Sequence, residues 1–454
     1  MASLNLGLPF HSVAGRSLRR RSLKPAARQT VSCSSSLTNK FKRAYTSVMI
    51  VPTGVGAAIG GYAGDALPVA RALSSIVDCL ISHPNNFNSF CFENFICSFA
   101  VLNAAMLYWP MPNVLYVEGY ALDRFAEGHW ALQPVHQNKV GLVLDAGIEE
   151  DLRLRHLQVV DATRASLGLP VVEYTVTDAA LQVCKVIVDK LYDVNAVMLD
   201  SVEKWIELES GQSTGRIKRL DSLLRAVEKL VDTASVNAIA VVARFPDDDT
   251  EDDVENYRQG KGIDLLAGVE AVISHLVVER FGIPCAHAPA LLPFPLNSSL
   301  SPKSAAEEIG YTFLPCVLAG LSTAPQYLVE NPKLLGKDSI VASDVDSVIL
   351  PIDACGGDGA LAFASRKTNR PLIIAVEENE TVLSDTPDKL GIQAVKVANY
   401  WEAIGVVAAH KAGIDPFSLR RDGINNIRLT MNHNYHNNAS SLNGCGAVAG
   451  NFLS

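Results

Sequence analysis

Short apolar runs rich in β-branched residues alternate with helical patterns along the chain, and this alternation restricts the fold more than any other sequence feature. The runs are Ser47–Val51, Val140–Leu144, Val171–Val176, Ala238–Ala243, Ser347–Ile352 and Leu372–Val376. The clearest helical pattern is an apolar stripe at 3.6-residue spacing from Ile217 to Val231. Because strands that are apolar on both faces must be covered on both faces, we predict an α/β fold with open, mostly parallel sheets, helices on both faces and Rossmann-like units.

The length of 454 residues allows two such units. We expect a first α/β unit over residues 41–245 and a second over residues 246–421, with a cleft shared between them. In open parallel sheets, ligands bind where the carboxyl ends of the strands meet the following loops. The loops after the predicted strands are therefore the places to look for a site.

The loop after the first predicted strand is rich in glycine, from Val51 to Asp65. Glycine lets backbone N–H groups approach a ligand closely, and a helix expected from Ala66 would direct its positive end at an anion. Neither the dinucleotide fingerprint nor the P-loop is present in standard form, since Ile59 stands where a glycine is needed and the Gly-Lys-Ser/Thr ending is absent. An anion-binding loop and a tightly packed turn both remain open. The candidate ligand-binding residues are Thr53, Gly54, Gly56, Gly60 and Gly61.

A second glycine loop, Asp353–Gly359, follows the run that ends at Ile352 and precedes a helix expected over Ala360–Ser365. Its carboxylates could act as a general base or bind Mg²⁺, or they could only satisfy N–H groups of the turn. The next strand delivers further acids at its end, and Cys355 is expected to be a buried small residue. The candidates are Asp353, Asp358 and Glu377 for catalysis, and Gly356, Gly357 and Glu378 for ligand binding.

Ser82-His83-Pro84-Asn85 is expected to end a helix running from Ala66 to Ile81. Histidine titrates near neutral pH, so His83 is a candidate for proton transfer and Asn85 a candidate ligand-binding residue. The alternative is a C-terminal cap that interacts with the helix dipole.

The charge distribution argues against nucleic acid as a partner. The chain has 39 basic and 48 acidic residues, and six of the basic residues lie within residues 1–33, which contain no acid. The remainder therefore has 33 basic against 48 acidic residues, whereas a phosphate-backbone binder needs a basic surface. No run reaches the roughly 18 apolar residues of a membrane span. Nine scattered cysteines without a C-x-x-C pair suggest reduced thiols.

The first 40 residues have the composition of an organellar targeting sequence. They are rich in serine and arginine and free of acids, which is typical of a transit peptide. Val31-Ser32-Cys33 predicts cleavage after Cys33 and a location in the chloroplast stroma, with the mitochondrion as the rival address. We exclude residues 1–40 from the fold.

Four segments together resemble a plant and cyanobacterial family catalogued only as a domain of unknown function. They are Val51–Ala57, Ser82–Asn85, Asp353–Gly359 and Pro371–Asn379, and the resemblance spans residues 45–421. It supports a plastid location and implies no catalytic residue, substrate or cofactor. Two segments depart from it. Residues 86–100 hold five of the 15 phenylalanines and are interpreted as an inserted or mis-spliced segment, with a hydrophobic loop that covers a pocket as the alternative. Residues 422–454 hold eight asparagines and are expected to be disordered.

These observations favour a soluble plastid enzyme that acts on a small anionic metabolite, phosphorylated or carboxylated, held by the two glycine loops. A ligand-binding or regulatory module without turnover is the alternative, and a structural partner is a third reading. The acids near the loops would repel a bare anion, so Mg²⁺ or a cationic group on the ligand is a plausible companion. The sequence names no substrate, reaction or oligomeric state.

Overall fold

A computed structural model gives the fold. It describes residues 43–52, 54–62, 65–83, 111–182, 204–206, 213–215, 217–245, 255–256, 258–264, 266–292, 298–305, 313–329, 336, 338–424 and 427. The expected address at residues 1–40, the insertion at 86–100 and almost all of the tail at 422–454 lie outside the described residues. The predictions for these three segments therefore stay predictions.

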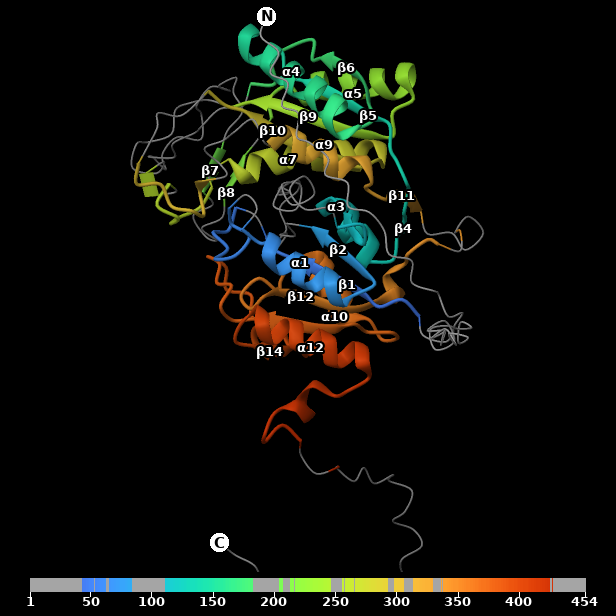
Figure 1. Cartoon of the computed structure of the whole chain (residues 1–454), viewed down its shortest axis with the longest axis vertical. Coiled ribbons are helices and arrows are strands. Elements are labelled where there is room, and N and C mark those ends of the chain that lie inside the picture. Colours follow the sequence, from blue (N-terminus) through green and yellow to red (C-terminus); the bar gives the residue numbers. More distant parts are fainter. Residues whose placement is uncertain are drawn as a thin grey trace, which may run out of the picture. The chain divides into compact units, whose positions relative to one another are not determined.

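The described residues contain a six-stranded parallel sheet whose strands come from both ends of the chain. Its order is β14-β13-β12-β1-β2-β3, and every neighbouring pair is parallel. In Figure 1 the blue strands β1 and β2 lie in one sheet with the orange and red strands β12 and β14. The strands are β1 (Thr46–Ile50), β2 (Cys79–His83), β3 (Val114–Tyr116), β12 (Val345–Pro351), β13 (Leu372–Val376) and β14 (Val395–Val397).

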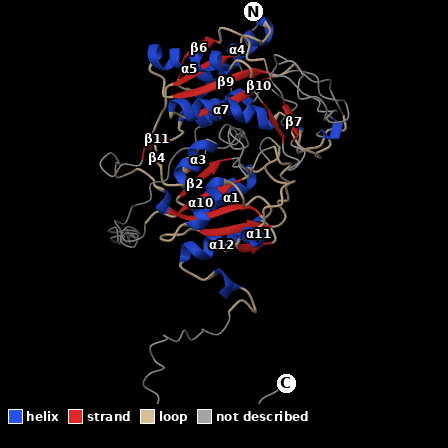
Figure 2. Cartoon of the chain, turned by 180° about the vertical axis from the view of Figure 1, so that it is seen from behind, coloured by secondary structure: helices blue, strands red, loops and turns tan. Residues whose placement is uncertain are grey.

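Alternate residues of these strands face two separate cores, which explains why most of their positions are apolar on both faces. Met49 packs with the helices α1 (Leu67–Ile76) and α12 (Tyr400–Ala412) on one face. Val48 and Ile50 pack with α3 (Gly119–Ala126) and α10 (Asp358–Ser365) on the other. Figure 2 shows strands flanked by helices in this way. The sheet is therefore doubly wound.

A four-stranded parallel sheet is formed by the chain between β3 and β12, in the order β10-β9-β5-β6. Its strands are β5 (Val140–Leu144), β6 (Val171–Val176), β9 (Ala238–Arg244) and β10 (Cys285–Ala290). Its helices are α4 (Glu150–Leu167), α5 (Leu220–Ala234), α7 (Ala267–Phe281) and α9 (Phe313–Ser322). One core contains α4 and α9, and the other contains α5 and α7 and is continuous with the core under α3 and α10.

Short elements complete the described structure. Two antiparallel pairs are formed by β4 (Trp130–Gln133) with β11 (Gln326–Val329) and by β7 (Lys204–Ile206) with β8 (Ser213–Gly215). The remaining elements are α11 (Pro387–Leu390) and the 3₁₀ turns η1 (Ala342–Asp344) and η2 (Pro416–Leu419).

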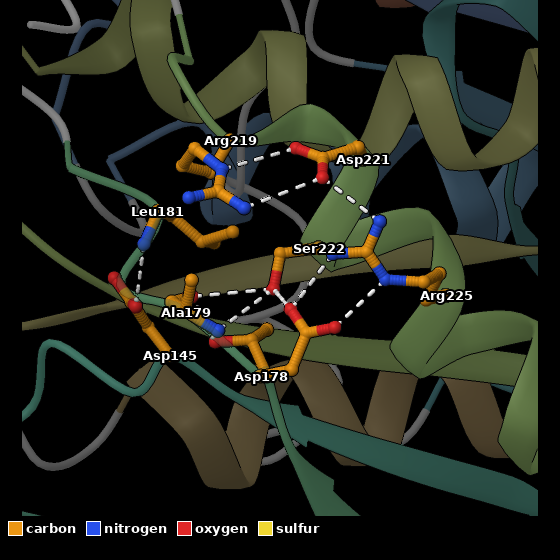
Figure 3. Close-up of polar contacts among 9 residues, drawn as sticks. Asp145, Asp178, Ala179, Leu181, Arg219, Asp221, Ser222 and Arg225 are labelled. Atoms are coloured by element: carbon orange, nitrogen blue, oxygen red, sulfur yellow. Dashed lines mark hydrogen bonds and ion pairs between the residues drawn. The ribbon is translucent and has the colours of Figure 1, made fainter. Parts of the chain in front are cut away.

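The loops at the carboxyl edge of the four-stranded sheet are held together by protein groups (Figure 3). The carboxylate of Asp145, a residue only 1% exposed, accepts N–H bonds from Gly147, Leu181 and Arg244 at 2.9, 2.9 and 3.2 Å. On the surface, Arg225 binds Asp178 through two nitrogens, at 2.7 and 2.9 Å. Exposed ion pairs of this kind contribute little to stability, so Asp145 is the main link between these loops.

The predicted fold class is confirmed: the protein is α/β with open parallel sheets and helices packed against them. One local prediction is wrong. The expected helix from Ala66 to Ile81 ends at Ile76, and His83 ends strand β2 instead of capping a helix. The reason is that Cys79–His83 pairs with β1, and a short apolar run cannot be assigned to helix or strand from periodicity alone. Residues 41–245, expected in one unit, contribute strands to both sheets.

Candidate functional site

The direction of the winding reverses between β1 and β12 of the six-stranded sheet. From β1 the chain proceeds outward to β2 and β3, then returns beside β1 as β12 and proceeds outward the other way to β13 and β14. This is the strand order of dinucleotide-binding folds, in which the ligand lies at the carboxyl ends of the two strands where the order reverses. The two glycine loops predicted from the sequence follow these two strands, after Ile50 and after Pro351.

Hydrogen bonds bring the two glycine loops together through the loop that follows β13. Val382 donates its N–H to the carbonyl of Val55 at 2.9 Å. The adjacent residue, Thr381, donates its N–H to Oδ2 of Asp353 at 2.8 Å. The first loop, the second loop and the loop after β13 are thus direct neighbours at one edge of the sheet.

The second half of the first loop is satisfied by the protein itself. Ile59 donates its N–H to Oδ1 of the buried Asn379 at 2.8 Å, and Ala58 donates to the carbonyl of Glu380 at 2.9 Å. Gly60 donates to Oδ1 of Asp65 at 2.6 Å. Asp65 stands two residues before α1, so a carboxylate of the chain takes up an N–H group of the loop close to the amino end of this helix. The N–H groups from Ala58 to Gly60 are therefore not available to a ligand.

The first half of the loop is different. Gly54 and Gly56 have φ angles of +68° and +61°, and Val55 between them is not in the left-handed region. Such alternation points successive N–H groups to one side, a backbone arrangement that binds anions. Within the described part of the chain, the N–H groups of Val55, Gly56 and Ala57 donate to no protein acceptor. Val55 is 0% and Ala57 2% exposed, so the N–H groups of these two residues need a partner other than bulk water, while Gly56 between them is partly exposed.

Segments from the chain between β3 and β12 cover this half-loop. Ser213 of β8 donates its N–H to the carbonyl of Gly54 at 2.7 Å, and its Oγ accepts the N–H of Gly268 at 3.1 Å. A Cβ at Gly56 would lie 3.1 Å from the side chain of Ile263. We name residues 54–57 the N–H cradle.

Lys303 and Asp65 supply the charge beside the cradle. The Lys303 ammonium bonds the carbonyl of Ala58 and lies 3.9 Å from Oδ2 of Asp65. Burial raises the pKa of Asp65 to about 6, although N–H bonds and the Lys303 charge oppose this effect. A substantial part of the Asp65 carboxyls is therefore protonated slightly below neutral pH.

In the second loop, Asp353 is held by one threonine. Its two carboxylate oxygens accept the N–H and the hydroxyl of Thr381, at 2.8 and 3.0 Å, while burial raises its pKa. Gly356 is needed for packing, since a Cβ there would collide with the carboxylate of Asp385. Cys355 is buried, as expected, and burial raises the pKa of its thiol to about 12.

The amino end of α10, which follows the second loop, is also occupied by the chain. Gly359 donates its N–H to Oδ1 of Asp123 at 2.9 Å. Burial, and then the charge of Asp358, raise the pKa of Asp123 well above its usual range. Asp358 is largely exposed, and its partial burial, followed by the charge of Glu127, raises its pKa. The sequence did not point to Asp123, because this residue lies in helix α3, 236 residues before Gly359 in the chain.

The other candidates are exposed or lie outside the described residues. Glu377 and Glu378 are exposed, and Glu378 accepts the N–H of Tyr400 at 2.7 Å. Thr53, Asn85 and the side chain of His83 lie outside the described residues. Among the residues that are described, no three His, Cys, Asp or Glu side chains are grouped so that they could hold a metal ion.

Comparison with known proteins identifies the family. Residues 46–190 and 192–420 match DUF3326, described as a protein of unknown function. The chain belongs to this family. An uncharacterized lipoprotein of a Synechococcus species is 51% identical over 377 residues, which are 83% of this chain and 94% of that protein. No solved structure matches the chain.

The DUF3326 match confirms the resemblance seen in the sequence and covers nearly the same residues. It includes both glycine loops, the loop after β13 and Lys303. In the described part of this DUF3326 protein, no helix is long and apolar enough to cross a membrane.

Proposed function

We propose that this protein binds a small anionic metabolite, phosphorylated or carboxylated, at the N–H cradle beside the point where the strand order reverses. The observation that carries the proposal is the set of N–H groups at Val55, Gly56 and Ala57, which donate to no acceptor among the described residues, with Val55 and Ala57 buried and Gly56 partly exposed. A phosphate or carboxylate oxygen satisfies several such donors at once. The N–H groups of the second glycine loop contribute less, since Gly359 is bound to Asp123.

We further propose that the protein is an enzyme. His83 ends β2, the strand next to β1, so its backbone lies at the same edge as the cradle. Asp123 and Asp358 have raised pKa values near α10, and a carboxyl that stays protonated can donate a proton to a leaving group. These residues would handle protons while the cradle holds the anion. The role that the sequence suggested for Asp353 is weakened by its two bonds to Thr381.

A ligand-binding or regulatory module without turnover is the second candidate. One observation favours it: of the acids expected to be catalytic, Asp353 is used within the protein and Glu377 is exposed. Such a module needs the cradle but none of the carboxylates. Binding without turnover for any ligand that saturates the cradle supports this alternative.

The location is proposed to be the chloroplast stroma, on the Ser/Arg-rich, acid-free leader. The family match begins at residue 46, after the expected leader, and the relative from Synechococcus is cyanobacterial. That relative carries the name lipoprotein, and a lipid anchor on this chain would place it on a membrane instead. Fractionation of isolated plastids into stroma and membranes distinguishes the two.

Isothermal titration with inorganic phosphate, pyrophosphate and citrate tests the binding proposal. We expect at least one of these probes to bind the wild-type protein saturably, and Gly56→Ala to weaken that binding, because the new Cβ meets Ile263 and distorts the cradle. Gly168→Ala is the matched control: the φ of Gly168 is +68°, close to the +61° of Gly56, and nothing lies within 4 Å of its Cβ position. Equal affinity of the two variants contradicts the proposal.

A further inference from the structure

Lys303 is a basic residue that reaches the first glycine loop from a distant part of the chain. It lies in the segment 298–305, between β10 and α9. Its ammonium bonds the carbonyl of Ala58, the residue directly after the cradle, and lies 5.9 Å from the centre of the Tyr62 ring. Because a lysine stem is long and flexible, the ammonium can move from this carbonyl to a neighbouring anion without a change of backbone.

The segment that carries Lys303 is anchored to the segment that covers the cradle. Ser301 donates its N–H to the carbonyl of Arg258 at 2.9 Å, and the Ser304 hydroxyl donates to the same carbonyl at 2.7 Å. The chain then continues from Arg258 to Ile263, which packs over Gly56. Lys303 is thus positioned by the same cover that encloses the N–H cradle.

The many acids around the cradle indicate that a bound anion needs a positively charged neighbour, and Lys303 can supply this charge. The three loops at this edge carry many acids, among them Asp65, Asp353, Asp385 and Glu380, and backbone N–H groups alone bear only partial positive charge. An anion in the cradle needs a full positive charge nearby. In the structure the Lys303 ammonium is 3.9 Å from Oδ2 of Asp65, an oxygen that is buried and accepts no hydrogen bond from the described residues. A cationic group therefore already stands beside the cradle.

We propose that Lys303 is a binding and specificity residue of the cradle, and that its ammonium contacts the anion that the N–H groups of Val55 to Ala57 hold. This inference rests on the proposed function. It names the ligand class more narrowly, as an anion whose charged group accepts from backbone N–H groups on one side and from an ammonium on the other. The Lys303 ammonium then supplies the positive charge beside the anion. From the sequence alone, Mg²⁺ or a cationic group on the ligand was expected to supply it.

The test compares Lys303→Met, Lys303→Arg and Lys261→Met with the wild type by isothermal titration of inorganic phosphate, pyrophosphate and citrate, at low and high salt. Lys261 is an exposed lysine on the covering segment and controls for the loss of one charge. Loss of a charge-assisted hydrogen bond weakens binding by roughly ten- to a hundredfold. We expect this loss for Lys303→Met, a smaller loss for Lys303→Arg, no change for Lys261→Met, and a weaker salt dependence in Lys303→Met than in the wild type.

Three different outcomes overturn the inference. If the wild type binds a probe and Lys303→Met binds it equally well, Lys303 is not a binding residue, while the cradle proposal stands. If the wild type binds none of the three probes, both proposals fail. The melting temperature of each variant is measured alongside. If Lys303→Met lowers both affinity and melting temperature, the neutral variant Lys303→Gln separates the two effects. The inference stands if Lys303→Gln restores the melting temperature but not the affinity. If Lys303→Gln restores both, the lysine serves the structure of the loop alone.

Discussion

The replacement Asp65→Asn tests the electrostatics of the first glycine loop. Asp65 accepts the N–H of Gly60, its side chain is 11% exposed, and burial raises its pKa from 3.8 to about 6. A carboxyl whose pKa is raised by folding binds its proton more tightly in the folded state. Its contribution to stability is therefore fully present below the unfolded pKa and is lost as the pH rises through the folded pKa.

The size of the effect follows from the shift. Each pKa unit corresponds to about 1.36 kcal/mol, so ionised Asp65 costs about 3 kcal/mol of stability above pH 6 or so, relative to acid conditions. Asparagine keeps an oxygen for the Gly60 N–H and carries no charge, so it imitates the protonated acid. We expect Asp65→Asn to gain stability relative to the wild type as the pH rises, by about 2 kcal/mol between roughly pH 4.5 and pH 7.5.

Urea unfolding followed by circular dichroism at the two pH values measures this difference. Asp161→Asn, on the exposed surface of α4, controls for the loss of one surface charge. The control should differ little from the wild type at either pH. A difference between Asp65→Asn and the wild type that is independent of pH, or that favours the wild type more as the pH rises, refutes the reasoning.

Three further predictions concern other parts of the chain. Asp353→Asn retains only part of the bonding to Thr381, so it should lower the free energy of unfolding by about 1–3 kcal/mol in urea titrations; unchanged stability would show that these bonds contribute nothing. Protein from isolated plastids should begin after Cys33 on N-terminal sequencing, and an intact Met1 or a mitochondrial location contradicts the proposed address. Deletion of residues 86–100 removes a phenylalanine-rich segment and should leave the melting temperature no lower, whereas a clear fall would show native packing.

The sequence predicted six of the ten strands of the two parallel sheets described in the structure, because central strands that are buried on both faces form apolar runs. Val140–Leu144 and Leu372–Val376 have the predicted bounds, and so does the edge strand Val171–Val176, although three of its residues are exposed. Helix α5 likewise buries Leu223 and Leu230 of the predicted apolar stripe. The error at His83 arose where a helix and a strand follow each other within one apolar run, and only pairing with β1 decides between them.

The pairing of distant strands leaves no local record, and this limited what could be predicted about the site. The periodicity of the sequence does not indicate that β12 lies beside β1. Nor does it indicate that β2 and β3 follow on one side of this pair, and β13 and β14 on the other. The glycine content located the cradle, but not which N–H groups the chain itself satisfies. Asp123 and Lys303 act across long chain separations, on Gly359 and Ala58, and their neighbours in the sequence carry no sign of these contacts.

The central claim is that the N–H groups of Val55, Gly56 and Ala57 bind an anion. A titration of ¹⁵N-labelled protein with the anion that binds best in calorimetry, followed by the amide chemical shifts, tests it most directly. The account predicts saturable shifts of these three amides, with the same dissociation constant as calorimetry, and small shifts for Ile59 and Gly60, whose N–H groups are already bound within the protein. Saturable binding that shifts amides elsewhere and leaves these three unchanged would contradict the claim.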